Sequence, residues 1–87
     1  MMKKIWADKA WEDYLYWQAQ DKKTVNKINK LIKEIDRHPF EGTGHPEPLK
    51  HGRQGYWSRR IDEYNRLIYR IEGGNIEIAQ CKAHYDD

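Results

Sequence analysis

The chain has 87 residues and a formal net charge of +2, with 34% charged and 38% hydrophobic residues. This length allows a single domain over residues 1–87, and an aromatic content of 13% argues against disorder, since disordered segments contain few aromatic side chains. The small net charge does not by itself indicate a nucleic-acid partner, no apolar run is long enough to cross a membrane, and the first residues lack the apolar stretch of a secretory signal. The single cysteine excludes an internal disulfide and is typical of the reducing cytoplasm.

The first part of the chain predicts a strand followed by two helices. Residues 3–6 predict a short strand, and apolar residues then recur at helical spacing over residues 8–20, with Asp8 as the expected N-cap. Asp21 is the expected N-cap of a second helix, which carries a strong apolar stripe. We expect this helix to end at Pro39, because the residue before a proline is disfavoured in a helix. Almost no loop separates the two helices, so we expect an antiparallel helical hairpin.

Residues 39–55 are the least regular part of the chain and hold all three prolines. A connection of this length in a small domain is commonly functional or disordered, and the prolines favour an ordered loop. Glu47 lies between two of these prolines, which restrict the backbone and so direct its carboxylate; a solvated loop acid is the alternative interpretation. His38, His45 and His51 are too irregularly spaced to predict a metal site, and no cofactor is predicted.

From residue 56 onward, apolar and polar residues alternate with the period of a β-strand. This pattern predicts strands over 56–61, 66–72 and 75–81, with Gly73-Gly74 as a hairpin turn between the last two. Together with the helical hairpin, these strands predict an α+β fold of order β-α-α-β-β-β, in which the helices cover one face of an antiparallel sheet.

The expected turns also predict how these strands pair. They place Arg60 opposite Arg66, and Arg66 opposite Cys81, on the open face of the sheet. Because like charges that face each other destabilise a sheet, the two arginines require an anion or a functional reason. Arg59 falls on the apolar face and would have to reach the edge of the sheet. Cys81 has no histidine partner placed by spacing that would activate its thiol.

The loop and the open face together supply the groups needed to cleave RNA. A general base removes the proton of a 2′-hydroxyl, whose oxygen attacks the adjacent phosphorus; arginines stabilise the developing negative charge, and an acid protonates the departing 5′ oxygen. Tyr56 and Tyr85 are suited to stacking on unpaired bases. For His84, a histidine at a frayed chain end is the alternative interpretation. A non-catalytic RNA-binding or ribosome-docking module is the alternative function.

Short motifs follow one another in order along nearly the whole chain. They are Ile5-Trp6, Trp11-Glu12-Asp13-Tyr14-Leu15-Tyr16-Trp17, Lys27-Ile28-Asn29, Pro39-Phe40-Glu41-Gly42, Pro46-Glu47-Pro48-Leu49-Lys50-His51, Trp57-Ser58-Arg59-Arg60-Ile61, Arg66-Leu67-Ile68-Tyr69 and His84-Tyr85. In these motifs the chain resembles the YoeB/Txe toxins of bacterial type II toxin–antitoxin systems, within the RelE-like superfamily. The resemblance implies a RelE-like fold.

The resemblance further implies a ribosome-dependent endoribonuclease, or mRNA interferase, that cuts mRNA in the ribosomal A site and inhibits translation. Its products would be a 2′,3′-cyclic phosphate or 3′-phosphate and a 5′-hydroxyl. By the same resemblance Glu47 is the general base, Arg66 stabilises the transition state and His84 is the general acid. The implied substrate-binding residues are Lys50, Arg60 and Tyr85.

The implied partners are the ribosome with its mRNA and a YefM/Phd-type antitoxin, whose disordered C-terminal segment folds onto the toxin and disables the site. Operator DNA would be bound only as the toxin–antitoxin complex, and a homodimer is compatible with the family. In one departure from the family pattern, Asp86 and Asp87 follow Tyr85 in this sequence. Their carboxylates would weaken phosphate binding nearby.

Overall fold

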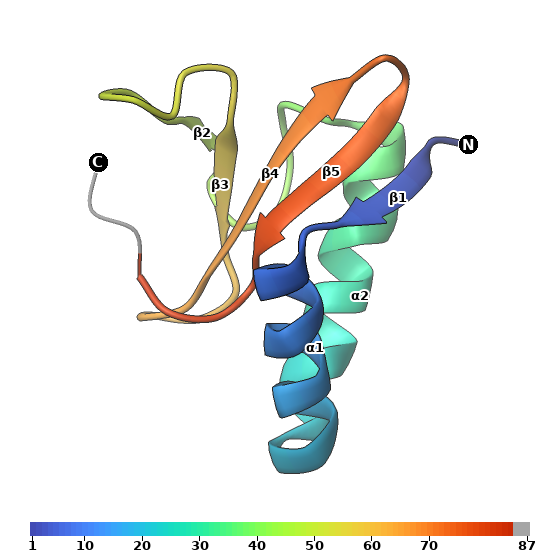
Figure 1. Cartoon of the computed structure of the whole chain (residues 1–87), viewed down its shortest axis with the longest axis vertical. Coiled ribbons are helices and arrows are strands. Elements are labelled where there is room, and N and C mark those ends of the chain that lie inside the picture. Colours follow the sequence, from blue (N-terminus) through green and yellow to red (C-terminus); the bar gives the residue numbers. More distant parts are fainter. Residues whose placement is uncertain (85–87) are drawn as a thin grey trace.

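In the computed structural model, which describes residues 1–84, two antiparallel helices pack against one face of a five-stranded sheet (Figure 1). The elements in chain order are β1 (Lys3–Trp6), α1 (Asp8–Gln20), α2 (Lys22–Arg37), β2 (Glu47–Pro48), β3 (Trp57–Arg60), β4 (Arg66–Glu72) and β5 (Asn75–Gln80). The predicted α+β class, the first strand and the helical hairpin are therefore confirmed.

The sheet differs from the prediction in two ways. Its strand order is β1-β5-β4-β3-β2, and β1 runs parallel to β5 whereas the other neighbours are antiparallel, so the sheet is mixed rather than purely antiparallel. Two parallel strands need a long connection between them. Here the connection from β1 to β5 starts with the two helices of the hairpin. In addition, Glu47 and Pro48 form a short strand within the expected loop. This strand lies at the edge of the sheet, where a proline is tolerated because no ladder hydrogen bond needs its missing N–H.

The expected cap is confirmed for α2 and wrong for α1. The Asp21 side chain accepts a hydrogen bond from the Lys23 backbone N–H at 3.1 Å, which satisfies one of the unpaired donors at the start of α2. In α1 the N-cap is Ala7, and Asp8 is instead the first helical residue. There its carboxylate interacts favourably with the positive end of the helix dipole. Helix α2 ends before Pro39, as predicted.

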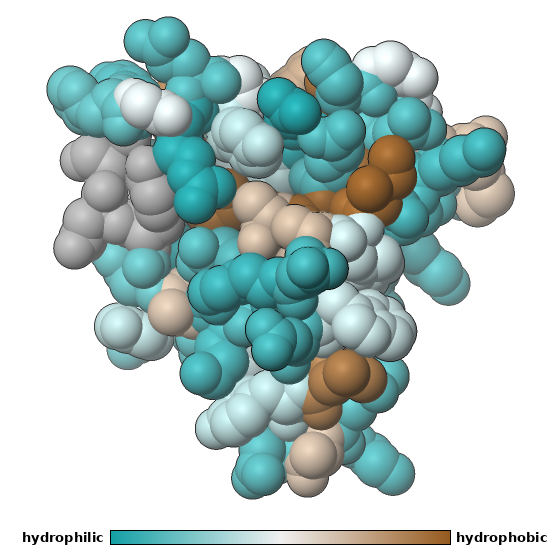
Figure 2. All heavy atoms as spheres, viewed as in Figure 1, coloured by the Kyte–Doolittle hydropathy of each residue, from teal (hydrophilic) through white to brown (hydrophobic). Residues whose placement is uncertain are grey.

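The hydrophobic core lies between the helices and the sheet. Its buried members are Ala10, Ile28, Leu31, Ile32, Ile35, Ile61, Leu67, Tyr69, Ile76, Ile78 and Cys81. Fully burying one large aliphatic side chain contributes about 1.5–3 kcal/mol, so this layer supplies most of the stabilisation of the fold. The outer surface seen in Figure 2 is largely hydrophilic, with apolar side chains in small groups. No helix of residues 1–84 is long and apolar enough to span a membrane.

A register shift in the β4–β5 pair changes which side chains share a face. The shift lies between Ile68 and Tyr69, and beyond it the Arg66 backbone N–H donates to the Ala83 carbonyl at 3.1 Å. A shift of one residue moves a side chain to the other face of a sheet. Cys81 accordingly lies in the core with no exposed surface, and the predicted pairing of Arg66 with Cys81 is wrong.

Candidate active site

A pocket of about 180 Å³ lies where β2, β3, β4 and the segment after β5 meet. Its lining residues are His45, Glu47, Leu49, Ser58, Arg60, Arg66 and His84. Four of the six predicted site residues therefore line one pocket, although they come from positions 47 to 84 of the chain. Lys50 does not line it, and Tyr85 falls outside the described residues.

The strand register explains how the carboxylate and the two arginines reach one place. Glu47 pairs with Ser58 across β2 and β3, and Arg60 pairs with Arg66 across β3 and β4. Ser58 and Arg60 are two residues apart on β3, so their side chains lie on the same face of the sheet. The predicted opposition of Arg60 and Arg66 is confirmed, and it lies one step along the sheet from Glu47.

The turn between β3 and β4 holds the Arg66 side chain. Its guanidinium donates to the backbone carbonyls of Asp62 at 2.8 Å, of Asn65 at 3.2 Å and of Glu63 at 3.2 Å. These acceptors are neutral carbonyl oxygens that orient the guanidinium, and the nearby Asp62 carboxylate also interacts with it electrostatically. Arg66 therefore presents a fixed positive charge to the pocket.

His84 reaches the pocket through the segment that follows β5. The Arg66 backbone N–H donates to the Ala83 carbonyl, and the Ala83 N–H donates to Asn65 Oδ1 at 2.7 Å. The His84 ring lies against Tyr64, with 5.9 Å between the ring centroids. The histidine proposed as the acid is thus held beside the turn that orients Arg66.

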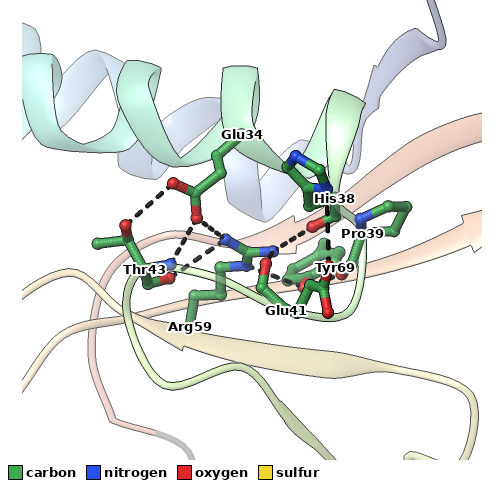
Figure 3. A network of polar contacts seen from close by, with 7 residues as sticks. All are labelled: Glu34, His38, Pro39, Glu41, Thr43, Arg59 and Tyr69. Carbon is green, nitrogen blue, oxygen red and sulfur yellow. Dashed lines mark hydrogen bonds and ion pairs between the residues drawn. The ribbon is translucent and has the colours of Figure 1, made fainter.

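Arg59, the neighbour of Arg60 on β3, is buried on the opposite face of the sheet from the pocket. Its guanidinium has no exposed surface, and its five N–H groups donate to Tyr69 Oη, Glu34 Oε1 and the carbonyls of Thr43, His38 and Glu41 (Figure 3). The expectation that Arg59 reaches the edge of the sheet is therefore wrong, because the loop after α2 closes over it and brings acceptors to every donor. A buried guanidinium is tolerated only when it is paired in this way.

Glu34 ties the same loop to helix α2. Its carboxylate accepts hydrogen bonds from the backbone N–H and the hydroxyl of Thr43, and it pairs with Arg59 at 2.6 Å. The backbone hydrogen bond from Thr43, with smaller contributions from its hydroxyl and from Arg59, outweighs burial and holds the pKa of Glu34 below its ordinary value of 4.5. The loop that leads to Glu47 is thus anchored by an ionised carboxylate at neutral pH.

Gly44 brings this loop against β3. Its carbonyl accepts the Arg60 backbone N–H at 2.7 Å, and a Cβ at this position would lie 3.1 Å from the Arg60 carbonyl oxygen. The backbone φ of +89° also favours glycine. The next residue, His45, enters the pocket with φ at 51°. It is a pocket residue that the sequence interpretation missed, because nothing in the neighbouring sequence places its side chain there.

Cys81 is the only cysteine of the chain, and it lies buried in the core. Burial, and next the charge of Asp13, raise the pKa of Cys81 to about 12, so this buried thiol is not a nucleophile at neutral pH. Residues 1–84 contain no group of three or more His, Cys, Asp or Glu side chains arranged to hold a metal ion.

Comparison with known proteins agrees with the motifs. Residues 6–85 match the family described as YoeB-like toxin of bacterial type II toxin-antitoxin system. Toxin YoeB of Escherichia coli (strain K12) is 56% identical over 84 residues, which cover 97% of this chain and 100% of that protein. The solved structure of a YoeB/ParE toxin from Agrobacterium tumefaciens is 48% identical, with a TM-score of 0.95 and coverage of 97% of this chain and 100% of that chain.

Two solved structures from Staphylococcus aureus show related chains in assemblies. A YoeB dimer is 48% identical, with a TM-score of 0.91 and coverage of 97% of this chain and 98% of that chain. A YoeB-YefM complex is 46% identical, with a TM-score of 0.90 and coverage of 98% and 99%. The α+β fold, the pocket and these similarities define a bacterial toxin of a toxin–antitoxin system, and the chain belongs to the YoeB-like toxin family.

Proposed function

We propose that this toxin is a ribosome-dependent endoribonuclease that cuts mRNA in the ribosomal A site and thereby inhibits translation. The observation that carries the proposal is that one pocket unites Glu47, the opposed pair Arg60 and Arg66, and His84. Transfer of a phosphoryl group to a 2′-hydroxyl requires a base, a site for extra negative charge and an acid. These four side chains supply all three.

In the proposed reaction, the Glu47 carboxylate accepts the proton of the 2′-hydroxyl as that oxygen forms a bond to the adjacent phosphorus. The bond from phosphorus to the 5′ oxygen breaks, and His84 in its protonated form donates a proton to that oxygen. Arg66, oriented by the turn carbonyls, stabilises the negative charge on the phosphoryl oxygens together with Arg60. The products are a 5′-hydroxyl and a 2′,3′-cyclic phosphate, which water can hydrolyse to a 3′-phosphate.

Substrate binding would extend beyond the pocket. Lys50 and Tyr85 are proposed to contact the phosphate and the base. Tyr56 adds an aromatic surface with two cations, since the guanidinium carbons of Arg53 and Arg70 lie 5.4 Å and 5.1 Å from its ring centroid. Aromatic rings and guanidinium planes both stack on unpaired bases, so this surface is suited to single-stranded RNA.

We also propose that a YefM/Phd-type antitoxin covers the pocket and that operator DNA is bound only by the resulting complex. The YoeB-YefM complex from Staphylococcus aureus supports the first part, and the YoeB dimer from the same organism supports a homodimer. A protein that acts on translating ribosomes would work in the cytoplasm.

The decisive experiment maps the 5′ ends of an mRNA after incubation with the protein, with and without programmed ribosomes. With the wild-type protein, new 5′ ends are expected only when programmed ribosomes are present. Glu47→Gln and His84→Ala should each lower cleavage by about 100-fold or more while ribosome binding persists. Glu12→Gln, which removes an exposed carboxylate from α1, is the matched control.

Two outcomes would contradict the proposal. Growth arrest that persists unchanged in Arg66→Ala would show that phosphoryl transfer is not the toxic activity. Ribosome binding and translation inhibition without any new 5′ end would instead support a non-catalytic ribosome-docking inhibitor.

A further inference from the structure

Asn65 bonds at once to the turn that orients Arg66 and to the segment that carries His84. Its Oδ1 accepts the Ala83 backbone N–H at 2.7 Å, and its Nδ2 donates to Asp62 Oδ2 at 3.0 Å. The side chain therefore bridges two segments that are separated by 18 positions in the sequence. We propose that Asn65 is a positioning residue that sets the placement of His84 relative to Arg66, an inference that rests on the proposed function.

Asp62 holds Asn65 in the orientation that this bridge needs. Asp62 Oδ1 accepts the backbone N–H groups of Tyr64 at 2.8 Å and of Asn65 at 2.6 Å, and its other oxygen takes the Asn65 amide. An Asn side chain whose Nδ2 is committed to a carboxylate must direct its Oδ1 the other way, toward Ala83. Asp62 thus determines which atom of Asn65 faces the C-terminal segment.

Ala83 is the point on which Asn65 acts. Its φ of +79° lies in the left-handed region, which a residue with a Cβ adopts only when the surroundings enforce it. Its N–H bonds to Asn65 Oδ1, and its carbonyl accepts the Arg66 N–H. Removing the Asn65 side chain takes away one of these two bonds, so Ala83 can relax to an ordinary conformation. His84 is the next residue and would move with it.

The arrangement predicts loss of rate rather than loss of binding. Arg60 and Arg66 remain in Asn65→Ala, so ribosome affinity should hold. The proton donor would be displaced, and a displacement of about 1 Å can cost about 100-fold in rate. We therefore expect Asn65→Ala to lower the single-turnover cleavage rate by about 10- to 100-fold with little change in the half-saturating ribosome concentration.

A reciprocal exchange separates this role from a general structural one. Asn65→Asp alone places two carboxylates in contact, and Asp62→Asn alone places two amide donors in contact, so each single variant should cleave slowly. The double variant Asp62→Asn/Asn65→Asp restores the bond with donor and acceptor exchanged, and it keeps an acceptor for Ala83. We expect it to recover most of the wild-type rate. Asn26→Ala, an exposed position on α2, is the matched control.

A second readout does not depend on cleavage. The Ala83 amide should exchange its hydrogen slowly in the wild type, rapidly in Asn65→Ala and slowly again in the double variant. The positioning role would be overturned if Asn65→Ala cleaved mRNA at the wild-type rate. It would also be overturned if the double variant folded but cleaved no faster than the two single variants. Failure of the wild-type protein to cut ribosome-bound mRNA would instead overturn the proposed function, while amide exchange still tests the bridge itself.

Discussion

Arg60 and Arg66 lie directly opposite each other on β3 and β4, on the face of the sheet that the helices leave uncovered. Two guanidinium groups at such positions repel each other unless an anion lies between them. The hydrogen bonds that hold the Arg66 guanidinium go to neutral carbonyl groups, although the Asp62 carboxylate lies near enough to attract it. We therefore expect the pair to favour binding of a phosphate at some cost to the stability of the empty protein.

The first prediction follows from this repulsion. Arg60→Gln should raise the free energy of unfolding by about 0.2–1 kcal/mol, because it removes one of two like charges on facing strands. The same variant should lose most of the extra stability that phosphate gives over chloride at equal ionic strength. Urea denaturation in the two salts measures both effects, with Lys23→Gln on the exposed face of α2 as the control. Undiminished stabilisation by phosphate in Arg60→Gln would contradict an anion site at this pair.

A second prediction compares two glycines with nearly the same backbone. Gly44 and Gly52 have φ values of +89° and +88°, but a Cβ at Gly44 meets β3 whereas nothing lies within 4 Å of one at Gly52. Gly52→Ala should cost about 1–2 kcal/mol from the backbone alone. Gly44→Ala should cost more and also slow cleavage, because the loop that carries His45 and Glu47 must move away from Arg60. Urea denaturation and mRNA cleavage test this; equal effects of the two variants would exclude a role for the contact.

A third prediction concerns acid stability. The folded pKa of Glu34 is lowered from 4.5, so its contribution to stability is present above about pH 4.5 and is lost as the pH falls through the lower folded value. At neutral pH, Glu34→Gln should cost about 1–3 kcal/mol, since it weakens the pairing of the buried Arg59 guanidinium. The difference between wild type and variant should shrink below pH 4.5 in urea titrations. A gap that stays constant over this pH range would argue against an ionised Glu34 carboxylate.

A fourth prediction uses Cys81 as a reporter of the core. Its thiol has no exposed surface and a pKa raised to about 12, first by burial and then by Asp13, so little thiolate forms near neutral pH. Alkylation at about pH 8 should therefore be limited by opening of the structure in the native protein and become rapid in denaturant. Mass spectrometry of labelled protein follows both rates. Rapid labelling of the folded protein would show that the segment after β5 does not shield this residue.

Much of the fold follows from local patterns in the sequence. Strand β4 begins and ends at the predicted residues, and the short turns place Arg60 opposite Arg66 because alternation and turn length together determine an antiparallel register. The pairing of β1 with β5 was not predictable in this way, because it joins strands separated by the rest of the chain. The shift beside Ile68 likewise leaves no mark in the alternation, yet it moves Cys81 from the open face to the core.

The candidate site was likewise predictable from the sequence only in part. The motifs around Glu47, Arg66 and His84 were sufficient to identify the toxin family, since they depend only on residue type and order. Arg59 was correctly assigned to the core face of β3, but nothing near it in the sequence indicates that residues 38–43 would supply its acceptors. Nor does the sequence show that His45 lines the pocket.

The sequence by itself therefore determined the kinds of elements, the turn that opposes two arginines and the family to which the chain belongs. Tertiary structure decided where two segments lie. The pairing of Glu34 with Arg59 places the loop after α2, and the hydrogen bond of Asn65 with Ala83 places the segment that follows β5. The physical reason is one of range. Hydrophobic periodicity and turn preferences act between near neighbours, whereas a hydrogen bond between distant segments exists only after packing has brought its donor and acceptor together.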